Sequence, residues 1–336
     1  MQAAIYGLAG LTLSPDERAF FRDVDPAGYI LFARNCGDPD QLMALTASLR
    51  DLHGRADLPI LIDQEGGRVM RMKPPVWPSL PAGGAFEKLY QTAPSSAIEA
   101  ARMNARAIGL MLSAHGINVN CIPNLDVRQP DADKVVGDRA YGTEPMQVAA
   151  IGRAVLDGLG SAGVVGVVKH MPGHGRATVD SHKELPRVSA AADELEVDLE
   201  PFETLREASM GMVAHILFEA WDSELPSSQS PFIIEEIIRK RIGFSGLLMT
   251  DDIGMEALKG SAGERSAAAL AAGCDLTLHC SGDFAEMLDV AAHVGAMDGE
   301  AEGRLARAMA GAMLGSSEGP DFAAAVAVRD ELLALA

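Results

Sequence analysis

Cysteine is scarce in this sequence. The chain of 336 residues contains four cysteines, Cys36, Cys121, Cys274 and Cys280, and no two of them form a CxxC pair. A disulfide-stapled secreted fold needs a denser set of cysteines, and CxxC-type zinc or redox sites need closer spacing. The scarcity argues against those classes and predicts a reduced, intracellular protein.

Basic residues are also few. Lysine and arginine number 28 against 47 acidic residues, which gives a formal net charge of −19. Nucleic acids and anionic membranes attract such a chain only through a strong local basic patch. The basic clusters at 68–73 and 239–241 are short. We therefore expect neither a nucleic-acid partner nor a membrane partner.

Long apolar runs are missing as well. No run reaches the ~18 residues that a membrane-spanning helix needs. The stretch 1–17 is apolar at first, but it has no basic segment and runs into acidic residues. A secretory signal peptide would begin with positive charge, so none is expected here.

The sequence does contain a repeated alternation of short apolar runs with helical stretches. The runs are continuous, as in strands buried on both faces, and such alternation is typical of a parallel sheet with right-handed crossovers. Eight units favour a closed (β/α)₈ barrel of the TIM type over an open doubly wound sheet, which is further weakened because no glycine-rich dinucleotide fingerprint follows any strand. We predict one α/β barrel domain over residues 1–336, with strands at 3–9, 28–33, 58–63, 117–122, 164–169, 211–216, 246–251 and 274–280.

Helices are predicted between most of these strands. The first link, 10–27, is short enough to hold only a brief helix, and the long link 64–116 carries extra loop. The C-terminal part is predicted to be helical over 283–314 and 322–335. The remaining predicted helices cover 39–54, 96–115, 144–162, 192–209, 230–241 and 261–272.

Polar side chains gather at the predicted strand ends. Buried charges are costly unless they are paired or used, and barrels of this type carry their active sites at the carboxyl ends of the strands. Six polar residues from five strands are difficult to attribute to packing alone. The pattern therefore predicts one shared polar site built from Asp63, Lys169, His170, His215, Asp251 and His279.

Several of these residues also allow a purely structural interpretation. Asp252 could cap the next helix, and Arg139 in the segment VVGDRAYG could be a surface arginine. His215 and His279 could each satisfy a local hydrogen bond. Asp251 ends its strand and should point over the barrel mouth, where it could serve as a nucleophile, a metal ligand or an acceptor for hydroxyl groups.

The segment KHMPGHGRATVDSHKELP, residues 169–186, is the most unusual stretch. A metal site would need three or four ligands held rigidly, whereas the candidates here are spread through a loop with glycine and proline. Asp180 and His182 are two positions apart, which suits a hydrogen-bonded pair in which the carboxylate orients the ring for acid–base catalysis. The glycines at 173 and 175 would allow the loop to move over a ligand.

Three motifs together resemble glycoside hydrolase family 3. They are IDQEGGRV, KHMPGHG with DSH, and GFSGLLMTDDIGM, and they stand in the family's order. The resemblance covers the chain from 28 to 278. It is closest to the single-domain N-acetyl-β-D-glucosaminidase branch, the NagZ type, because the second domain of many family members is missing.

The resemblance implies a retaining glycosidase without a cofactor or metal. Asp251 matches the family nucleophile, His182 matches the acid/base, and Asp180 is the partner of His182. The residues that match binders of the terminal N-acetylglucosamine are Asp63, Arg71, Arg139, Lys169 and His170. The implied role is cell-wall recycling: removal of N-acetylglucosamine from N-acetylglucosaminyl-1,6-anhydro-N-acetylmuramyl peptides in the cytoplasm.

Some alternatives remain open at the level of sequence. Met171, Thr250 and Ile253 differ from common residues of the family motifs, and they lie beside the matched catalytic positions. A glycosyl phosphorylase on the same residues is one alternative, and a non-catalytic sugar-binding barrel is another. A metal-dependent barrel hydrolase would use His170, His174, Asp180 and His182. The oligomeric state and the preferred leaving group are not predicted.

Overall fold

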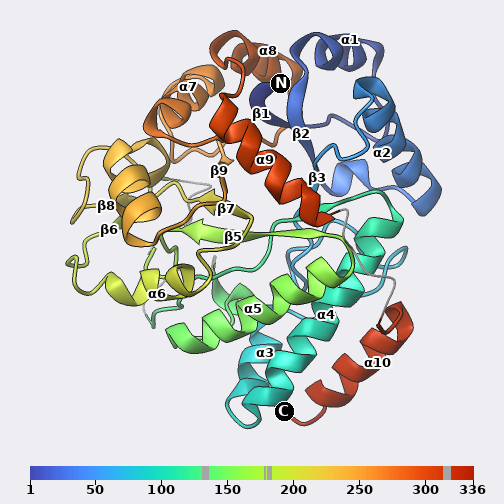
Figure 1. The fold of residues 1–336 in the computed structure, drawn as a ribbon, viewed down its shortest axis with the longest axis vertical. Helices are drawn as coiled ribbons and strands as arrows, with labels where there is room; N and C mark the ends of the chain where they lie inside the picture. Colours follow the sequence, from blue (N-terminus) through green and yellow to red (C-terminus); the bar gives the residue numbers. More distant parts are fainter. Residues whose placement is uncertain (131–135, 178, 180–183, 313–318) are drawn as a thin grey trace.

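The strands form a closed parallel barrel in the order β1-β10-β9-β7-β5-β4-β3-β2. The structure is a computed structural model that describes residues 1–130, 136–177, 179, 184–312 and 319–336 (Figure 1). The predicted barrel is therefore confirmed. Its strands are β1 (Gln2–Gly7), β2 (Pro26–Leu31), β3 (Ile60–Ile62), β4 (Val119–Asn120), β5 (Val165–Met171), β7 (Met210–Val213), β9 (Leu247–Asp252) and β10 (Leu276–His279).

The apolar runs form strands because both of their faces are covered. Side chains pointing inward fill the barrel, and those pointing outward pack under the helices, so β1, β2 and β5 are buried along their whole length. The ring closes where β1 pairs with β10, with Ala4 opposite Thr277. A separate two-stranded sheet joins β6 (Arg187–Val188) to β8 (Leu217–Phe218).

Helices surround the barrel in the expected order (Figure 1). The helix α9 contacts β5 and β9, and in Figure 1 it crosses the middle of the barrel. It lies beside Ser209 and Gly246, which precede β7 and β9, so it covers the amino ends of the strands. The helices are α1 (Pro15–Val24), α2 (Pro39–His53), α3 (Gly83–Tyr90), α4 (Pro94–Ala114), α5 (Pro145–Ser161), α6 (Glu196–Thr204), the π-helix η4 (Ile233–Arg241), α7 (Ala262–Ala272), α8 (Phe284–His293), α9 (Gly299–Ala312) and α10 (Phe322–Leu333).

The structure differs from the prediction in the C-terminal part. The stretch 283–314 is not one helix, because residues 294–297 leave helical geometry and bind the start of β1. Ala3 N–H donates to Gly295 O at 3.0 Å, and Met297 N–H donates to Met1 O at 2.9 Å. These bonds end α8 and turn the chain so that α9 can cross the barrel. The brief helix expected within 10–27 is α1, which starts with a capping box between Ser14 and Glu17.

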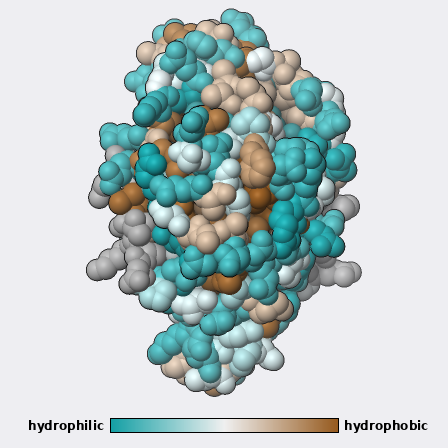
Figure 2. Space-filling view, turned by 90° about the vertical axis from the view of Figure 1, so that its left-hand side faces the viewer, coloured by the Kyte–Doolittle hydropathy of each residue, from teal (hydrophilic) through white to brown (hydrophobic). Residues whose placement is uncertain are grey.

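The surface is mostly polar. Figure 2 shows a face covered largely by hydrophilic side chains, with apolar ones scattered among them. No helix in the described part of the chain is long and apolar enough to cross a membrane. The large apolar side chains that are exposed include Met146, Phe232 and Leu335, which lie far apart in the sequence.

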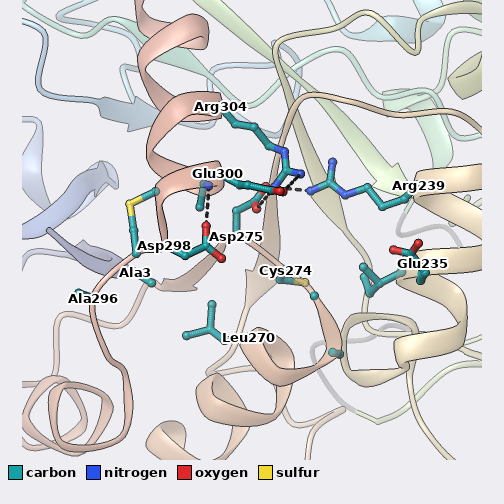
Figure 3. Close-up of a pocket in the computed structure, with 15 residues that line it drawn as sticks. Ala3, Glu235, Arg239, Leu270, Cys274, Asp275, Ala296, Asp298, Glu300 and Arg304 are labelled. Carbon is teal, nitrogen blue, oxygen red and sulfur yellow. Dashed lines mark hydrogen bonds and ion pairs between the residues drawn. The ribbon is translucent and has the colours of Figure 1, made fainter.

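A network of ion pairs centred on Asp275 joins several elements at the amino ends of the strands. Asp275, which directly precedes β10, accepts hydrogen bonds from Leu248 N–H, from Arg239 of η4 and from Arg304 of α9, at 2.8, 2.8 and 2.7 Å. These residues lie beside a cavity of about 460 Å³ at this end of the barrel (Figure 3). The Asp275 side chain is only 6% exposed, and both arginines pair with it.

We expect Asp275→Asn to lower the free energy of unfolding by about 3 kcal/mol, because both arginines lose the carboxylate that they share. Urea unfolding followed by circular dichroism measures this loss. A midpoint equal to that of the wild type would show that Asp275 does not join η4 and α9 to the barrel.

Candidate active site

Six of the predicted site residues line one cavity at the carboxyl ends of the strands. The cavity has a volume of about 270 Å³. Its apolar walls come from inward-facing barrel residues, among them Ile30, Met212 and Leu278. The predicted residues that line it are Asp63, Arg71, Arg139, Lys169, His170 and Asp251.

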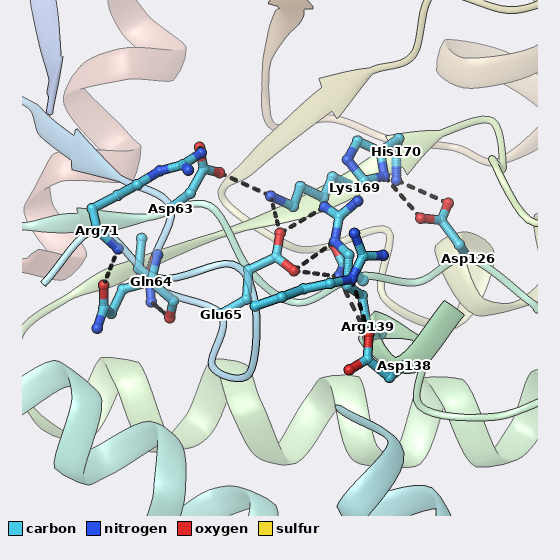
Figure 4. A network of polar contacts seen from close by, with 12 residues as sticks. Asp63, Gln64, Glu65, Arg71, Asp126, Asp138, Arg139, Lys169 and His170 are labelled. Carbon is cyan, nitrogen blue, oxygen red and sulfur yellow. Dashed lines mark hydrogen bonds and ion pairs between the residues drawn. The ribbon is translucent and has the colours of Figure 1, made fainter. Parts of the chain in front are cut away.

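Lys169 occupies the centre of the polar wall. Its ammonium lies 3.0 Å from Asp63 Oδ1 and 2.8 Å from Glu65 Oε1 (Figure 4), and its side chain is 2% exposed. Asp63 also accepts a hydrogen bond from Arg71 Nη2 at 2.9 Å. One buried cation from β5 therefore joins two carboxylates from the end of β3.

Glu65 connects this group to Arg139. Arg139 donates through Nε and Nη2 to the two Glu65 oxygens at 2.8 and 2.7 Å, and Asn124 donates a further bond at 3.0 Å. The Arg139 side chain is 14% exposed. The interpretation of Arg139 as a plain surface arginine is therefore wrong, because two N–H groups of its guanidinium donate to a buried carboxylate.

These contacts keep both carboxylates ionised. Burial opposes the charged form of Asp63, but Lys169 and Arg71 outweigh it and lower the pKa of this carboxyl to about 2. Burial likewise opposes ionisation of Glu65, and Lys169 and Arg139 hold its pKa well below the usual range. The pKa of Lys169 is raised: burial alone would lower it, but Asp63 and Glu65 have the larger effect.

Asp251 stands at the end of β9 and faces the same cavity. One of its oxygens accepts a hydrogen bond from Asp252 N–H at 2.8 Å. Burial would raise its pKa, but the neighbouring His170 and His215 outweigh burial, so the pKa lies below the usual value. Asp251 is thus a half-buried, ionised carboxylate at the cavity.

Asp252 does not cap the following helix. Ser261 caps α7, with its side chain accepting from Glu264 N–H. Asp252 Oδ1 instead accepts hydrogen bonds from Gly254 N–H at 3.0 Å and Cys280 N–H at 3.1 Å. It therefore joins the ends of β9 and β10.

The two lone histidines behave differently from His170. His215 is buried, with Nδ1 2.6 Å from Ser228 Oγ and Nε2 3.0 Å from Asp252 O. His279 is buried next to Glu286 and Ser281, with Nε2 3.0 Å from each, and it is not among the cavity-lining residues. Both make local hydrogen bonds, as the structural interpretation allowed, but the buried Nδ1 of His279 has no partner among the described residues.

Asp180 and His182 lie outside the described residues, so the predicted dyad stays a prediction. Of the four residues in the metal-site alternative, the structure describes His170 and His174, whose ring centroids are 5.5 Å apart. No group of three or more potential metal ligands occurs in the part of the chain that is described. Burial lowers the pKa of His174 to about 4.

Comparison with known proteins places the chain in a family. The model of the glycosyl hydrolase family 3 N-terminal domain matches residues 8–309. The chain belongs to glycosyl hydrolase family 3. This confirms the resemblance inferred from the three motifs, and with it the assignment of the chain as a glycosidase.

Relatives within family 3 carry a consistent name. Proteins named beta-hexosaminidase from Aromatoleum aromaticum and Alkalilimnicola ehrlichii are 36% and 38% identical over 279 and 280 residues. These matches cover 82% of this chain and 78% and 79% of the relatives. The crystal structure of NagZ from Neisseria gonorrhoeae in complex with N-trifluoroacetyl-D-glucosamine has a TM-score of 0.85 at 30% identity, covering 99% of this chain and 96% of that one.

Two buried carboxylates of this family 3 site were not among the predicted site residues. Glu65 follows Asp63 by two positions in the motif IDQEGGRV. Asp126 stands in the segment CIPNLDV, where a polar residue follows a predicted strand at the active-site face. Their positions after strand ends could have pointed to both residues. Sequence spacing does not reveal which side chains of the site each of them contacts.

We expect Lys169→Met to lower the free energy of unfolding by about 3 kcal/mol at pH 7, because two buried carboxylates lose a shared cation. In the wild type both carboxyl pKa values are lowered, so the stability they contribute is lost as pH falls from about 5 to 2. In the variant these pKa values rise and the folded state takes up a proton earlier. The loss should therefore be smaller at pH 5 than at pH 7, as measured by urea unfolding.

Lys240→Met is the matched control, since this exposed lysine also lies between two carboxylates, those of Glu235 and Glu236. It should leave the unfolding midpoint unchanged. An equal loss in Lys169→Met at both pH values would contradict the proposed electrostatic role of Lys169.

Proposed function

We propose that the chain is a retaining β-N-acetylhexosaminidase that removes a terminal N-acetylglucosamine. One observation carries the proposal: an ionised carboxylate, Asp251, ends a barrel strand beside a ring of charged side chains in a cavity of about 270 Å³. Relatives named beta-hexosaminidase and a NagZ structure that holds a glucosamine derivative support this choice of sugar. We further propose that residues 1–336 act as one catalytic domain.

In the first chemical step, Asp251 attacks the anomeric carbon of the terminal sugar. A new bond forms from a carboxylate oxygen to that carbon, and the bond from the carbon to the leaving oxygen breaks. His182, protonated and oriented by Asp180, gives its proton to the leaving oxygen. The product is a covalent glycosyl-aspartate, and the aglycone departs.

In the second step, His182 is neutral and takes a proton from water. The water oxygen attacks the anomeric carbon, the bond to Asp251 breaks, and the sugar leaves with its original configuration. A histidine near its unperturbed pKa of ~6.5 suits both roles around neutral pH. No metal ion or organic cofactor takes part.

The charged ring would bind the sugar hydroxyl groups. Carboxylate oxygens of Asp63 accept hydrogen bonds from hydroxyls, Arg71, Arg139 and Lys169 present donors, and His170 presents its Nε2 atom. These side chains already hold one another in place, so little rotamer freedom is lost when a sugar binds. The cations also favour the ionised form of the nucleophile.

We propose peptidoglycan fragments as the substrate class. N-acetylglucosaminyl-1,6-anhydro-N-acetylmuramyl peptides carry the terminal sugar, and their breakdown takes place in the cytoplasm. A reduced compartment suits the four cysteines, all of which are free and three of which are buried.

Hydrolysis of an aryl N-acetyl-β-D-glucosaminide tests the roles of the residues. Asp251→Ala should lose activity by about 10⁴-fold or more, because the covalent route is gone. His182→Ala should lose less, since an aryl leaving group needs little protonation. Activity should also survive a chelator. An Asp251→Ala variant with wild-type activity would refute the nucleophile, and inactivation by the chelator would favour the metal-dependent alternative.

The configuration of the first product tests the mechanism independently. Proton NMR recorded within minutes of mixing should show the β-anomer of N-acetylglucosamine first, because two displacements retain configuration. Initial formation of the α-anomer would rule out a glycosyl-aspartate. A sugar phosphate formed only when inorganic phosphate is added would instead support the phosphorylase alternative.

A further inference from the structure

Asp126 is a buried carboxylate that the proposed chemistry does not use. It lies on the segment after β4, and its side chain is 1% exposed. Oδ1 accepts hydrogen bonds from His170 N–H at 3.2 Å and from His174 N–H at 2.8 Å. Oδ2 lies 2.8 Å from Nδ1 of the His170 ring (Figure 4). Oδ1 of Asp126 therefore binds backbone amides, and Oδ2 binds the ring of His170.

The position of Asp126 is set by pairing between the segment 124–129 and the stretch 169–175, which runs from the end of β5 into the following loop. Asn124 forms a parallel bridge with Lys169, and Leu125 N–H donates to Lys169 O at 2.6 Å. Gln129 N–H donates to Gly175 O at 3.1 Å. A side chain at Gly175 would come within 1.9 Å of Val127 O, so this position has no room for one. The segment 124–129 thus lies directly against 169–175 and cannot slide.

The charge of Asp126 decides the state of the His170 ring. Burial opposes ionisation, but the hydrogen-bonded His170 outweighs it and keeps the pKa of Asp126 low. An ionised carboxylate only accepts hydrogen bonds, so Nδ1 of His170 must carry a proton. The ring nitrogen on the other side, Nε2, is then left for the cavity that His170 lines.

We propose that Asp126 is a positioning residue that fixes the tautomer and the orientation of His170 for sugar binding next to Asp251. Within the described part of the chain, the titratable groups that face His170 are Asp126 from the segment after β4, His174 from its own loop and Asp251 from β9. Of these, only Asp126 bonds to the ring. The role of His170 toward the sugar rests on the proposed function, whereas its tautomer does not.

Asp126→Asn is a sharp test because the two oxygens have different partners. With its carbonyl in the place of Oδ1, asparagine still accepts both backbone bonds. Its amide group then takes the place of Oδ2 and donates to Nδ1, which forces the proton onto Nε2. The loop stays held while the ring changes tautomer.

Nitrogen-15 NMR of histidine-labelled protein reads the tautomer directly. The chain has eight histidines, and the His170→Gln variant assigns the signal. We expect Nδ1 of His170 to be protonated in the wild type and unprotonated in Asp126→Asn. A wild-type ring without a proton on Nδ1 overturns the proposal, and this measurement needs neither enzymatic activity nor a folded Asp126 variant.

Activity supplies the second measurement. Asp126→Asn should lower kcat/KM by about 100-fold, since the wrong tautomer presents the wrong group to the ligand. In a His170→Gln background, Asp126→Asn should not lower kcat/KM any further, because Asp126 acts through His170. An added loss in that background, or a changed tautomer with normal kcat/KM, overturns the positioning role.

Asp275→Asn is the matched control for loss of a buried carboxylate, because Asp275 lies at the amino ends of the strands. It should leave both kcat/KM and the His170 signal unchanged. An inactive wild type with the expected tautomer would refute the proposed function and leave the tautomer assignment standing.

Discussion

The site depends on a single buried cation placed between two carboxylates. Lys169 comes from β5, while Asp63 and Glu65 come from the end of β3. None of the three is tolerable alone in a buried position, since an unpaired charge there would cost several kcal/mol. Arg71 and Arg139 complete the balance at either side. These ion pairs fix the positions of three segments relative to one another before any ligand binds. The segments are the loop after β3, the end of β5 and the segment that carries Arg139.

Most of the barrel could be predicted from the sequence because its strands are buried on both faces. Continuous apolar runs such as 28–33 and 164–169 are hard to place in any other element. The break at 294–297 could not be predicted, since it depends on hydrogen bonds to β1, almost 300 residues away along the chain. Local helix propensity in 283–314 gave no sign of that distant partner.

In the candidate site, too, strand position could be predicted from the sequence and contacts between distant segments could not. Asp63, Lys169, His170 and Asp251 follow apolar runs directly, so strand position alone predicted that they would meet. Arg139 and Arg71 needed the family resemblance, because loop residues have no periodicity. Asp126 was not predicted because its partners are two backbone amides and a ring nitrogen of the segment 170–174. These contacts exist only when the segment after β4 pairs with the end of β5.

The cavity is closed below by packed barrel side chains, and α9 covers the opposite end of the strands. Under the proposed function, a glycan enters this pocket by its terminal sugar. A long polymer therefore presents the enzyme with one reactive unit per chain end, however many sugars it contains. The rate of reaction with a mixture of glycans should follow the molar concentration of chain ends and not the total mass of glycan. At equal mass, short fragments are therefore the better substrates.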